Sequence, residues 1–541
     1  MESGFSLRVK PFFFNLLAIL GAAVLFALSF PNPLFSSGLP FLAWIAYVPV
    51  FWVITRSTAV SLVFWGALYG YTSYSLFIPW LGAFHPLAGT IASLLQLCYM
   101  AFLFPLLRLA VTLYPEKGYF LQWFLWLAYE YLRTLGFLGF PYGITGYTQW
   151  EFPALIGIAS VFGVWGVSAL VLFPSVYLGA GLKDAKGGWG VFFRRERLAA
   201  AAWLGALAAS LVFGGINLNY TGKSAGELKI VLVQQNADPW KEENYRSSLR
   251  ALTALSQKAL DEDTDLVVWP ETAFIPRIYW HLTYRDNADN YPVVRELLDF
   301  LESQKVPYLI GNDDARLEVS NEGRWDRADY NAALLFKEGE LQQTYRKMRL
   351  VPFAEYFPYQ KAFPRLYKTL TEADTHFWKP GKEPVVFDAG RAGAAYPEDG
   401  GFRFSALICF EDCFGSISRD FTRRGAELLV NLTNDAWSGS LSSQAQHLSM
   451  AVFRAVENRR SLVRAASSGQ TCAIAPLGKI LALAEPFTKT AIAVEVPLMK
   501  GRTPYTVWGD LWGLLFLGAA IILLLTGTIR YILNRKHGKG H

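Results

Sequence analysis

Side chains suited to acyl-transfer chemistry lie at the ends of predicted strands in the second half of the chain. Cys409 closes the predicted strand 404–409 and is followed by Phe410 and Glu411. A thiolate can attack an ester or amide carbonyl when a neighbouring base or cation favours its ionised form. A cysteine in a strand is more often a buried small hydrophobe. What favours reactivity here is the position at a strand end, beside a glutamate.

Two further ionisable residues could complete such a site. Glu271 follows the apolar run 265–270, whose final proline forces a turn. A carboxylate there is usually solvated, but partial burial would let it accept the proton of the thiol. Lys347 lies in the basic cluster 345–349, just before an apolar segment that ends at Glu355. A lone lysine is usually a surface residue, whereas an ammonium beside a carbonyl stabilises an oxyanion. Glu355 is either a structural partner of Lys347 or a second carboxylate in the pocket.

These residues belong to a stretch, 222–500, in which strand and helix signals alternate. Short apolar runs rich in branched residues predict strands, and helical periodicity predicts helices between them. Strands separated by helices indicate an α/β fold with covered sheet faces, in which ligand-handling residues gather at strand ends. The predicted strands are 228–234, 265–270, 308–311, 333–336, 385–387, 404–409, 428–433, 472–476 and 491–496, and the predicted helices are 245–260, 293–304 and 444–459.

The chain as a whole is too apolar for a soluble protein of this size. Of its 541 residues, 52% are hydrophobic and only 17% are charged. A membrane-spanning helix needs about 20 mostly apolar residues. Eight segments meet this need: 11–30, 38–55, 58–78, 87–112, 119–135, 155–180, 198–217 and 511–533. We therefore expect a multi-domain protein with three parts: a polytopic α-helical membrane domain of seven helices (1–217), a globular domain (218–505), and an eighth helix with a basic tail (506–541).

Lysine and arginine residues occupy alternate loops of this predicted topology. The loops 31–37, 79–86 and 136–154 hold neither residue, whereas the intervening loops and both termini do. The positive-inside rule then places both termini in the cytoplasm and 218–510 outside. The net charge of +6 therefore reflects topology and does not indicate a nucleic-acid partner. Glu130 and Arg133, near the outer end of the fifth span, form either an ion pair on one helix face or a contact with lipid headgroups.

Cysteine usage gives no sign of a disulfide framework or of a metal. The chain has four cysteines and no Cys-x-x-Cys pair. We expect no metal and no cofactor. A disulfide between Cys409 and Cys413 would remove the nucleophile, and we favour Cys409 because it ends the strand and precedes Glu411.

The order of glutamate, lysine and cysteine in these local contexts resembles the carbon–nitrogen hydrolase (nitrilase) superfamily, whose site is a Glu–Lys–Cys triad. The motifs that carry the resemblance are Trp269-Pro-Glu271, Lys347 with Glu355, Cys409-Phe-Glu411, and the later segments 434–437, 446–447 and 454–458. With seven predicted helices before this domain and one after it, essentially the whole chain resembles the apolipoprotein N-acyltransferases, the membrane-embedded branch. The resemblance implies an α-β-β-α sandwich for the globular domain.

The resemblance also implies a ping-pong reaction. Cys409 would attack the sn-1 ester of a phospholipid, typically phosphatidylethanolamine, with Glu271 as base and Lys347 stabilising the tetrahedral intermediate. The α-amine of a diacylglyceryl-cysteine apolipoprotein would then take the acyl chain from the thioester. The implied setting is the bacterial inner membrane, with a multi-pass monomer whose catalytic domain faces the periplasm.

Supporting or substrate-binding roles are expected for Glu355, Glu411, Phe410, Trp240 and Trp437. Phe410 stands where such enzymes often have tyrosine, so any role for a hydroxyl group is lost at this position. Trp240 and Trp437 are either pocket walls or core residues. The aromatic-rich segments 353–363 and 377–378 are either a lid or membrane-dipping arm, or ordinary surface aromatics.

Two other functions fit part of the pattern. A membrane-anchored nitrilase-like amidase would pass the acyl group to water, and the triad cannot separate hydrolysis from transfer because only the second nucleophile differs. A transporter or scaffold is disfavoured because the predicted spans hold few ionisable residues and show no inverted repeat.

Overall fold

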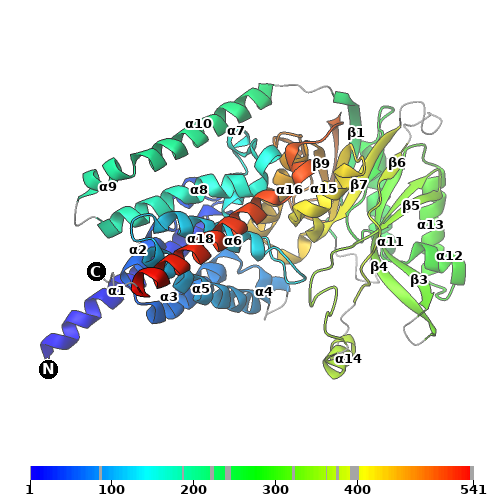
Figure 1. Ribbon diagram of the computed structural model, residues 1–541. Helices are drawn as coiled ribbons and strands as arrows, with labels where there is room; N and C mark the ends of the chain where they lie inside the picture. The colour runs from blue at the N-terminus through cyan, green and yellow to red at the C-terminus, as the bar shows by residue number, and fades with distance from the viewer. Residues whose placement is uncertain are drawn as a thin grey trace. The chain divides into compact units, whose positions relative to one another are not determined.

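The chain folds into two units of different architecture, shown in the computed structural model of Figure 1. The structure describes residues 2–84, 88–184, 188–219, 224–237, 245–319, 323–360, 362–372, 377–389 and 401–536. Unit 1 comprises Met1–Asn219, Ser438–Ser449 and Trp508–His541, and unit 2 comprises Tyr220–Trp437 and Met450–Val507. Unit 1 is helical, whereas unit 2 contains the β-strands.

The helices of unit 1 form from the long apolar runs of the sequence. They are α1 (Glu2–Ser29), α2 (Val48–Arg56), α3 (Ala59–Phe77), α4 (Leu81–Phe84), α5 (Ala88–Leu113), α6 (Gly118–Leu132), α7 (Pro153–Ile156), α8 (Ala159–Asp184), α9 (Trp189–Arg195), α10 (Arg197–Asn219) and α18 (Leu511–Lys536). Short 3₁₀ helices are η1 (Pro40–Trp44) and η2 (Thr145–Gln149). The exposed faces of α10 and α18 are rich in large apolar residues, among them Leu198, Ile216 and Ile522. Such faces are compatible with a membrane protein.

Five of the eight predicted spans are helices long and apolar enough to cross a membrane. Within the described residues these are Pro11–Ser29, Ala88–Leu113, Ala159–Lys183, Arg197–Leu218 and Leu511–Lys536. The other three predicted spans coincide with α3, α6 and the broken helical segment Pro40–Arg56. The helix α6 has 15 residues, so at ~1.5 Å per residue it is shorter than a bilayer core of about 30 Å. The number eight therefore stays a prediction.

Small residues allow the helices of unit 1 to approach closely. On α3, a Cβ added at Gly66 would lie 2.2 Å from the main-chain oxygen of Met100, and one at Gly70 would lie 2.3 Å from that of Gln96. Glycines four residues apart on one helix face are a common means of packing helices in membranes.

Glu130 and Arg133, the two charged residues near the end of α6, have separate hydrogen-bond partners. Glu130 is buried and accepts hydrogen bonds from Thr145, whereas Arg133 donates to the main-chain oxygen of Phe140 at 3.1 Å.

Unit 2 is built on two six-stranded sheets. The first has the strand order β12-β1-β2-β3-β4-β5 and the second β11-β10-β9-β8-β7-β6. The first-sheet strands are β1 (Ser224–Gln234), β2 (Leu266–Val268), β3 (Tyr308–Val319), β4 (Trp325–Lys337), β5 (Glu340–Arg346) and β12 (Thr490–Met499). The second-sheet strands are β6 (Phe387–Ala389), β7 (Phe402–Ile408), β8 (Leu428–Thr433), β9 (Ser461–Ala466), β10 (Cys472–Ile474) and β11 (Ile480–Leu483).

Each sheet has three parallel strands at its centre. The strands β1, β2 and β3 run parallel in the first sheet, and β7, β8 and β9 run parallel in the second. Antiparallel strands complete both sheets on either side. The carboxyl ends of β2 and β7 lead directly to Glu271 and Cys409, so the topology places both residues at strand ends, where α/β folds gather their functional groups.

Helices cover the first sheet because they carry apolar residues on one face. On α11 (Tyr245–Ala259), Leu249 and Leu252 point to the core, and on α13 (Asn290–Glu302), Val294 and Leu297 do so. They pack against strand residues such as Val267 and Ile310 to form one buried cluster. The remaining helices are α12 (Ile278–Tyr284), α14 (Pro364–Glu372), α15 (Gly415–Arg423), α16 (Leu441–Asn458) and α17 (Pro504–Trp508), and the 3₁₀ helices η5 (Cys409–Cys413) and η6 (Ala436–Ser438) follow β7 and β8.

The predicted α/β pattern of the globular region is confirmed as a nitrilase-like fold with two sheets. Each predicted strand and helix overlaps an observed one. The sequence did not reveal β5, β9, β11 or the short helices α12, α14 and α15. The strand β5 has the sequence Glu-Leu-Gln-Gln-Thr-Tyr-Arg, which lacks an apolar run, and it is a strand because it pairs with β4. Tertiary pairing there outweighs local preference.

Candidate active site

The nucleophile candidate lies on a sharp turn between β7 and η5. Cys409 is the first residue after β7 and has φ +50°, a left-handed backbone conformation that is uncommon for residues other than glycine. Its main-chain oxygen accepts a hydrogen bond from the Asn431 amide of β8 at 3.1 Å. The side chain is partly exposed, unlike that of Cys413, which is buried. All four cysteines are thiols, so the disulfide considered between Cys409 and Cys413 does not form.

Lys347 is fully buried, although a lysine is usually a surface residue. It follows β5, and its main-chain N–H donates to the Asn331 main-chain oxygen of β4 at 2.8 Å. Its ammonium donates to Glu355 at 2.7 Å and to Glu271 at 3.1 Å. Burial alone would lower the pKa of Lys347, but the charges of Glu271 and Glu355, with that of Cys409, raise it well above its usual value. The side chain is therefore a permanent cation.

Glu271 is buried as well, and its carboxylate is held by three donors. Oε1 accepts from the Asn331 amide at 2.8 Å and from the Lys347 ammonium, while Oε2 accepts from the main-chain N–H of Asn434 at 3.0 Å. Gly311 on β3 makes room for the turn, because a Cβ there would lie 2.1 Å from the main-chain oxygen of Pro270. The solvated-turn interpretation of Glu271 is therefore wrong.

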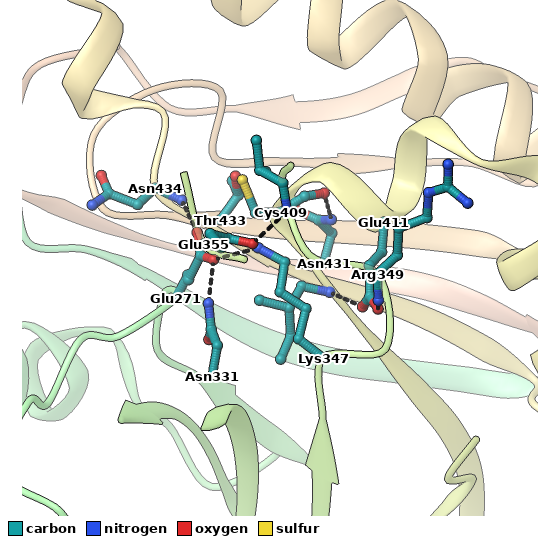
Figure 2. A network of polar contacts seen from close by, with 12 residues as sticks. Glu271, Asn331, Lys347, Arg349, Glu355, Cys409, Glu411, Asn431, Thr433 and Asn434 are labelled. Carbon is teal, nitrogen blue, oxygen red and sulfur yellow. Dashed lines mark hydrogen bonds and ion pairs between the residues drawn. The ribbon is translucent and has the colours of Figure 1, made fainter. Parts of the chain in front are cut away.

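Glu355 is a structural partner of Lys347 and also a second carboxylate in the cluster. Its Oε2 accepts the main-chain N–H of Val351 at 2.9 Å, while Oε1 binds the ammonium. Burial raises the pKa of Glu355, and the positive charge of Lys347 acts in the opposite direction. Figure 2 shows Glu271, Glu355 and Lys347 converging beside the sulfur of Cys409.

Glu411 holds the loop that carries Lys347. Its Oε1 accepts from the main-chain N–H groups of Met348 and Arg349 at 2.8 and 3.0 Å, and its Oε2 from that of Ile408 at 2.8 Å. The hydroxyl of Tyr345 on β5 reaches both oxygens. Because these donors already use the carboxylate, its role is to tie the Lys347 loop of the first sheet to the Cys409 turn of the second.

A buried arginine connects the Cys409 turn to the loop that follows β8. Arg464 on β9 is fully buried and forms ion pairs with Asp412 and, at 3.1 Å, with Asp435. Asp412 lies in the Cys409 turn, and Asp435 follows Asn434, whose N–H binds Glu271. The fork of a guanidinium suits such a pair of carboxylates.

The other predicted site residues lie around this cluster or outside the described part of the chain. Phe410 is partly buried in the Cys409 turn, with its ring 4.9 Å from that of Phe414. Trp437 is 38% exposed, which excludes the core interpretation, and its place in a pocket wall stays a prediction. Trp240 lies outside the described residues.

Sequence reasoning missed three residues that complete the geometry, namely Asn331, Asn431 and Gly311. Asn331 and Asn431 are buried polar side chains on the strands β4 and β8. The signal for both was an asparagine within an apolar strand, where a buried amide must find a hydrogen-bond partner. Gly311 gave no signal, since its steric role depends on how closely β3 approaches the turn after β2.

The cluster has the parts needed for nucleophilic catalysis on a carbonyl. A partly exposed thiol can act as the nucleophile, a hydrogen-bonded carboxylate as the base, and a buried ammonium as the donor to an oxyanion. Among the described residues, Asp412, Cys413 and His447 place ligand atoms within 4.8 Å of one another, a group that could hold a metal ion.

Comparison with known proteins matches both parts of the chain. Residues 229–503 match the carbon-nitrogen hydrolase family, and residues 22–177 match the apolipoprotein N-acyltransferase N-terminal domain. Apolipoprotein N-acyltransferase 1 of Treponema pallidum (strain Nichols) is 44% identical over 542 residues, covering 96% of each chain. The protein of the same name from Treponema denticola is 45% identical over 534 residues, covering 94% of this chain and 95% of the relative.

Solved structures match about half of the chain. An amidase of the nitrilase superfamily from Nesterenkonia is 18% identical with a TM-score of 0.34, and the match covers 51% of this chain and 94% of the amidase. The sequence relatives extend over nearly the full length at more than 40% identity and agree with both family matches. The chain therefore belongs to the apolipoprotein N-acyltransferase family and carries a carbon-nitrogen hydrolase domain.

Proposed function

We propose that this protein transfers an acyl chain from the sn-1 position of a phospholipid to the α-amine of a diacylglyceryl-cysteine apolipoprotein, through a thioester on Cys409. The observation that carries the proposal is a partly exposed thiol at a strand end, beside a buried ammonium that contacts two carboxylates. The names of the relatives support the acceptor, and the sequence resemblance supports the donor.

In the first half-reaction, the sulfur of Cys409 attacks the ester carbonyl while Glu271 takes the thiol proton. Oε1 of Glu271 already accepts two hydrogen bonds, so Oε2 is the oxygen expected to take that proton. The Lys347 ammonium donates to the oxyanion that forms. When the tetrahedral intermediate collapses, the C–O bond breaks, the lysophospholipid oxygen receives the proton from Glu271, and a thioester remains.

In the second half-reaction, the free amine of the acceptor attacks the thioester carbonyl. Glu271 takes a proton from the attacking nitrogen, and the same ammonium stabilises the second oxyanion. The C–S bond then breaks, Cys409 leaves as a thiolate and regains a proton, and the acceptor carries a new amide. Both half-reactions use one set of groups, which suits a ping-pong order.

Both substrates are anchored in a bilayer, and this fixes where the site must work. We propose that 218–505 is the catalytic domain on the periplasmic side of the bacterial inner membrane, with 1–217 and 506–541 as its membrane-embedded parts. Apolar helices and the alternation of basic loops support this placement. Exposed Phe353, Tyr359 and Phe363, in the segment that begins just after Lys347, offer an apolar surface for acyl chains.

The decisive experiment is intact mass spectrometry of the full-length protein in lipid nanodiscs that contain phosphatidylethanolamine. We expect an adduct with the mass of one acyl chain, removed by hydroxylamine and absent from Cys409→Ala. The matched control is Cys98→Ala, which removes an exposed thiol on α5 and should retain the adduct. Addition of a diacylglyceryl lipopeptide with a free amine should then discharge the adduct and give an N-acylated peptide.

Two results would contradict the proposal. Absence of the adduct, or its presence in Cys409→Ala, would reject the thioester. Release of fatty acid without N-acyl peptide would instead favour the membrane-anchored amidase, because water rather than an amine would then be the second nucleophile.

A further inference from the structure

Asn331 contacts both the base and the oxyanion donor of the proposed site. It lies on β4, is 1% exposed, and its amide nitrogen donates to Glu271 Oε1 at 2.8 Å. Its main-chain oxygen accepts the N–H of Lys347 at 2.8 Å. No motif pointed to this residue.

We propose that Asn331 is a positioning residue that holds the Glu271 carboxylate at a fixed distance from Lys347. The inference rests on the proposed function, in which Glu271 is the base. An ionised carboxylate only accepts hydrogen bonds, so an amide that faces it must present its nitrogen. Donation to the charged form favours that form over the protonated acid.

The charges around Glu271 explain why a neutral donor is needed. Glu271 and Glu355 both bind the Lys347 ammonium, and their charges, with that of Cys409, raise the pKa of Lys347. One ammonium thus faces up to three anions. Asn331 contributes a donor without adding charge, so it stabilises the ionised base without competing with Glu271 for the ammonium.

The Asn331 side chain makes its hydrogen bond through its amide nitrogen, to Glu271. A buried amide normally uses both its oxygen and its nitrogen. Within the described residues, Oδ1 of Asn331 is buried without a hydrogen-bond partner, and only its nitrogen is used, toward Glu271. On β4 it is the last polar residue before the apolar residues Ala332, Ala333 and Leu334.

The test measures how fast iodoacetamide alkylates Cys409 as a function of pH, in the full-length protein, by mass spectrometry of the Cys409 peptide. Alkylation requires loss of the Cys409 thiol proton, which Glu271 takes in the proposed mechanism. The rise of the alkylation rate with pH at its acid end, the acid limb, therefore reports on Glu271. In Asn331→Leu we expect this limb to move to higher pH by about 1–2 units, as expected for loss of one hydrogen bond to a charged group. The near-isosteric Asn331→Asp should shift it in the same direction, because two adjacent carboxyl groups share a proton.

The matched control is Asn458→Leu, which removes another fully buried asparagine amide of unit 2, one bound to the main-chain oxygen of Arg454 at 3.0 Å. It should lower thermal stability and leave the midpoint of the acid limb in place. Unchanged midpoints in both Asn331 variants, with only a loss of stability, would overturn the inference. Iodoacetamide is a soluble probe, so the result is independent of the phospholipid adduct. If no phospholipid adduct forms but the acid limb of alkylation shifts, phospholipid is rejected as the acyl donor, and the positioning role of Asn331 stands.

Discussion

Gly311→Ala tests whether the position of Glu271 is set by the close approach of β3. A Cβ at residue 311 would lie 2.1 Å from the main-chain oxygen of Pro270, 2.7 Å from the nitrogen of Thr272 and 2.8 Å from the Cα of Glu271. All three atoms belong to the backbone of the turn that carries the proposed base. Gly311 is not among the positive-φ glycines, so alanine adds a clash without adding backbone strain.

The size of the effect follows from the shortest of these distances. To reach ordinary van der Waals contact, the 2.1 Å separation must grow by more than 1 Å. A misplacement of about 1 Å at a catalytic group costs about 10²-fold in rate, which corresponds to ~2.7 kcal/mol in the barrier. Overpacking of the core costs a further ~1–3 kcal/mol of unfolding free energy.

The assay compares the rate of Cys409 acylation from phospholipid with the thermal unfolding midpoint of the same full-length sample. Gly311→Ala should unfold cooperatively at a lower temperature and acylate about 100-fold more slowly. The control is Gly205→Ala on α10, where an added Cβ meets nothing within 4 Å. If Gly311→Ala acylates at the rate of the unmodified protein, the turn is not held by β3 and the steric argument is refuted.

Three further predictions concern buried charge. Lys347→Met removes the donor to the oxyanion, so adduct formation should slow by at least about 10²-fold, and an unchanged rate would exclude that role. Arg464→Met removes the buried guanidinium that pairs with Asp412 and Asp435 and should cost ~3–5 kcal/mol of unfolding free energy in denaturant titration, more than Arg464→Lys. Burial lowers the pKa of His281, so the unfolded chain binds the proton more readily. Stability should therefore fall as pH drops below about 6.5, and His281→Gln should weaken this dependence in thermal unfolding at pH 5.5 and 7.5.

The sequence was informative wherever a local pattern decides the structure. Long apolar runs predicted the helices of unit 1, and short apolar runs predicted the central strands of both sheets. Glu271 and Cys409 could be found because each directly follows such a strand. Lys347 was harder, since its burial depends on β5, a strand whose polar sequence gives no sign of its pairing with β4.

The contact between Lys347 and Glu355, eight residues apart, could be proposed from the sequence, but most contacts that hold the site together join residues far apart in the chain. Asn331 meets Glu271 from 60 positions away, and Tyr345 meets Glu411 from 66. Such pairs follow from the register between strands and from the way the two sheets pack, neither of which a single sequence displays. The role of Glu411 illustrates the limit. Its nearness to Cys409 suggested a supporting residue, but only the structure shows that its partners are the main-chain donors of a distant loop.

The groups proposed to react come from separate sheets: Glu271 and Lys347 follow strands of the first, and Cys409 follows a strand of the second. During synthesis, the ribosome makes Glu271 and Lys347 well before Cys409, and the strands β8, β9 and β12 come later still. A newly made chain thus has no assembled nucleophile until nearly all of the globular region has been translated and folded. A chain that has not yet folded would therefore lack the assembled site, and no acyl adduct should form on Cys409 before the globular region is complete.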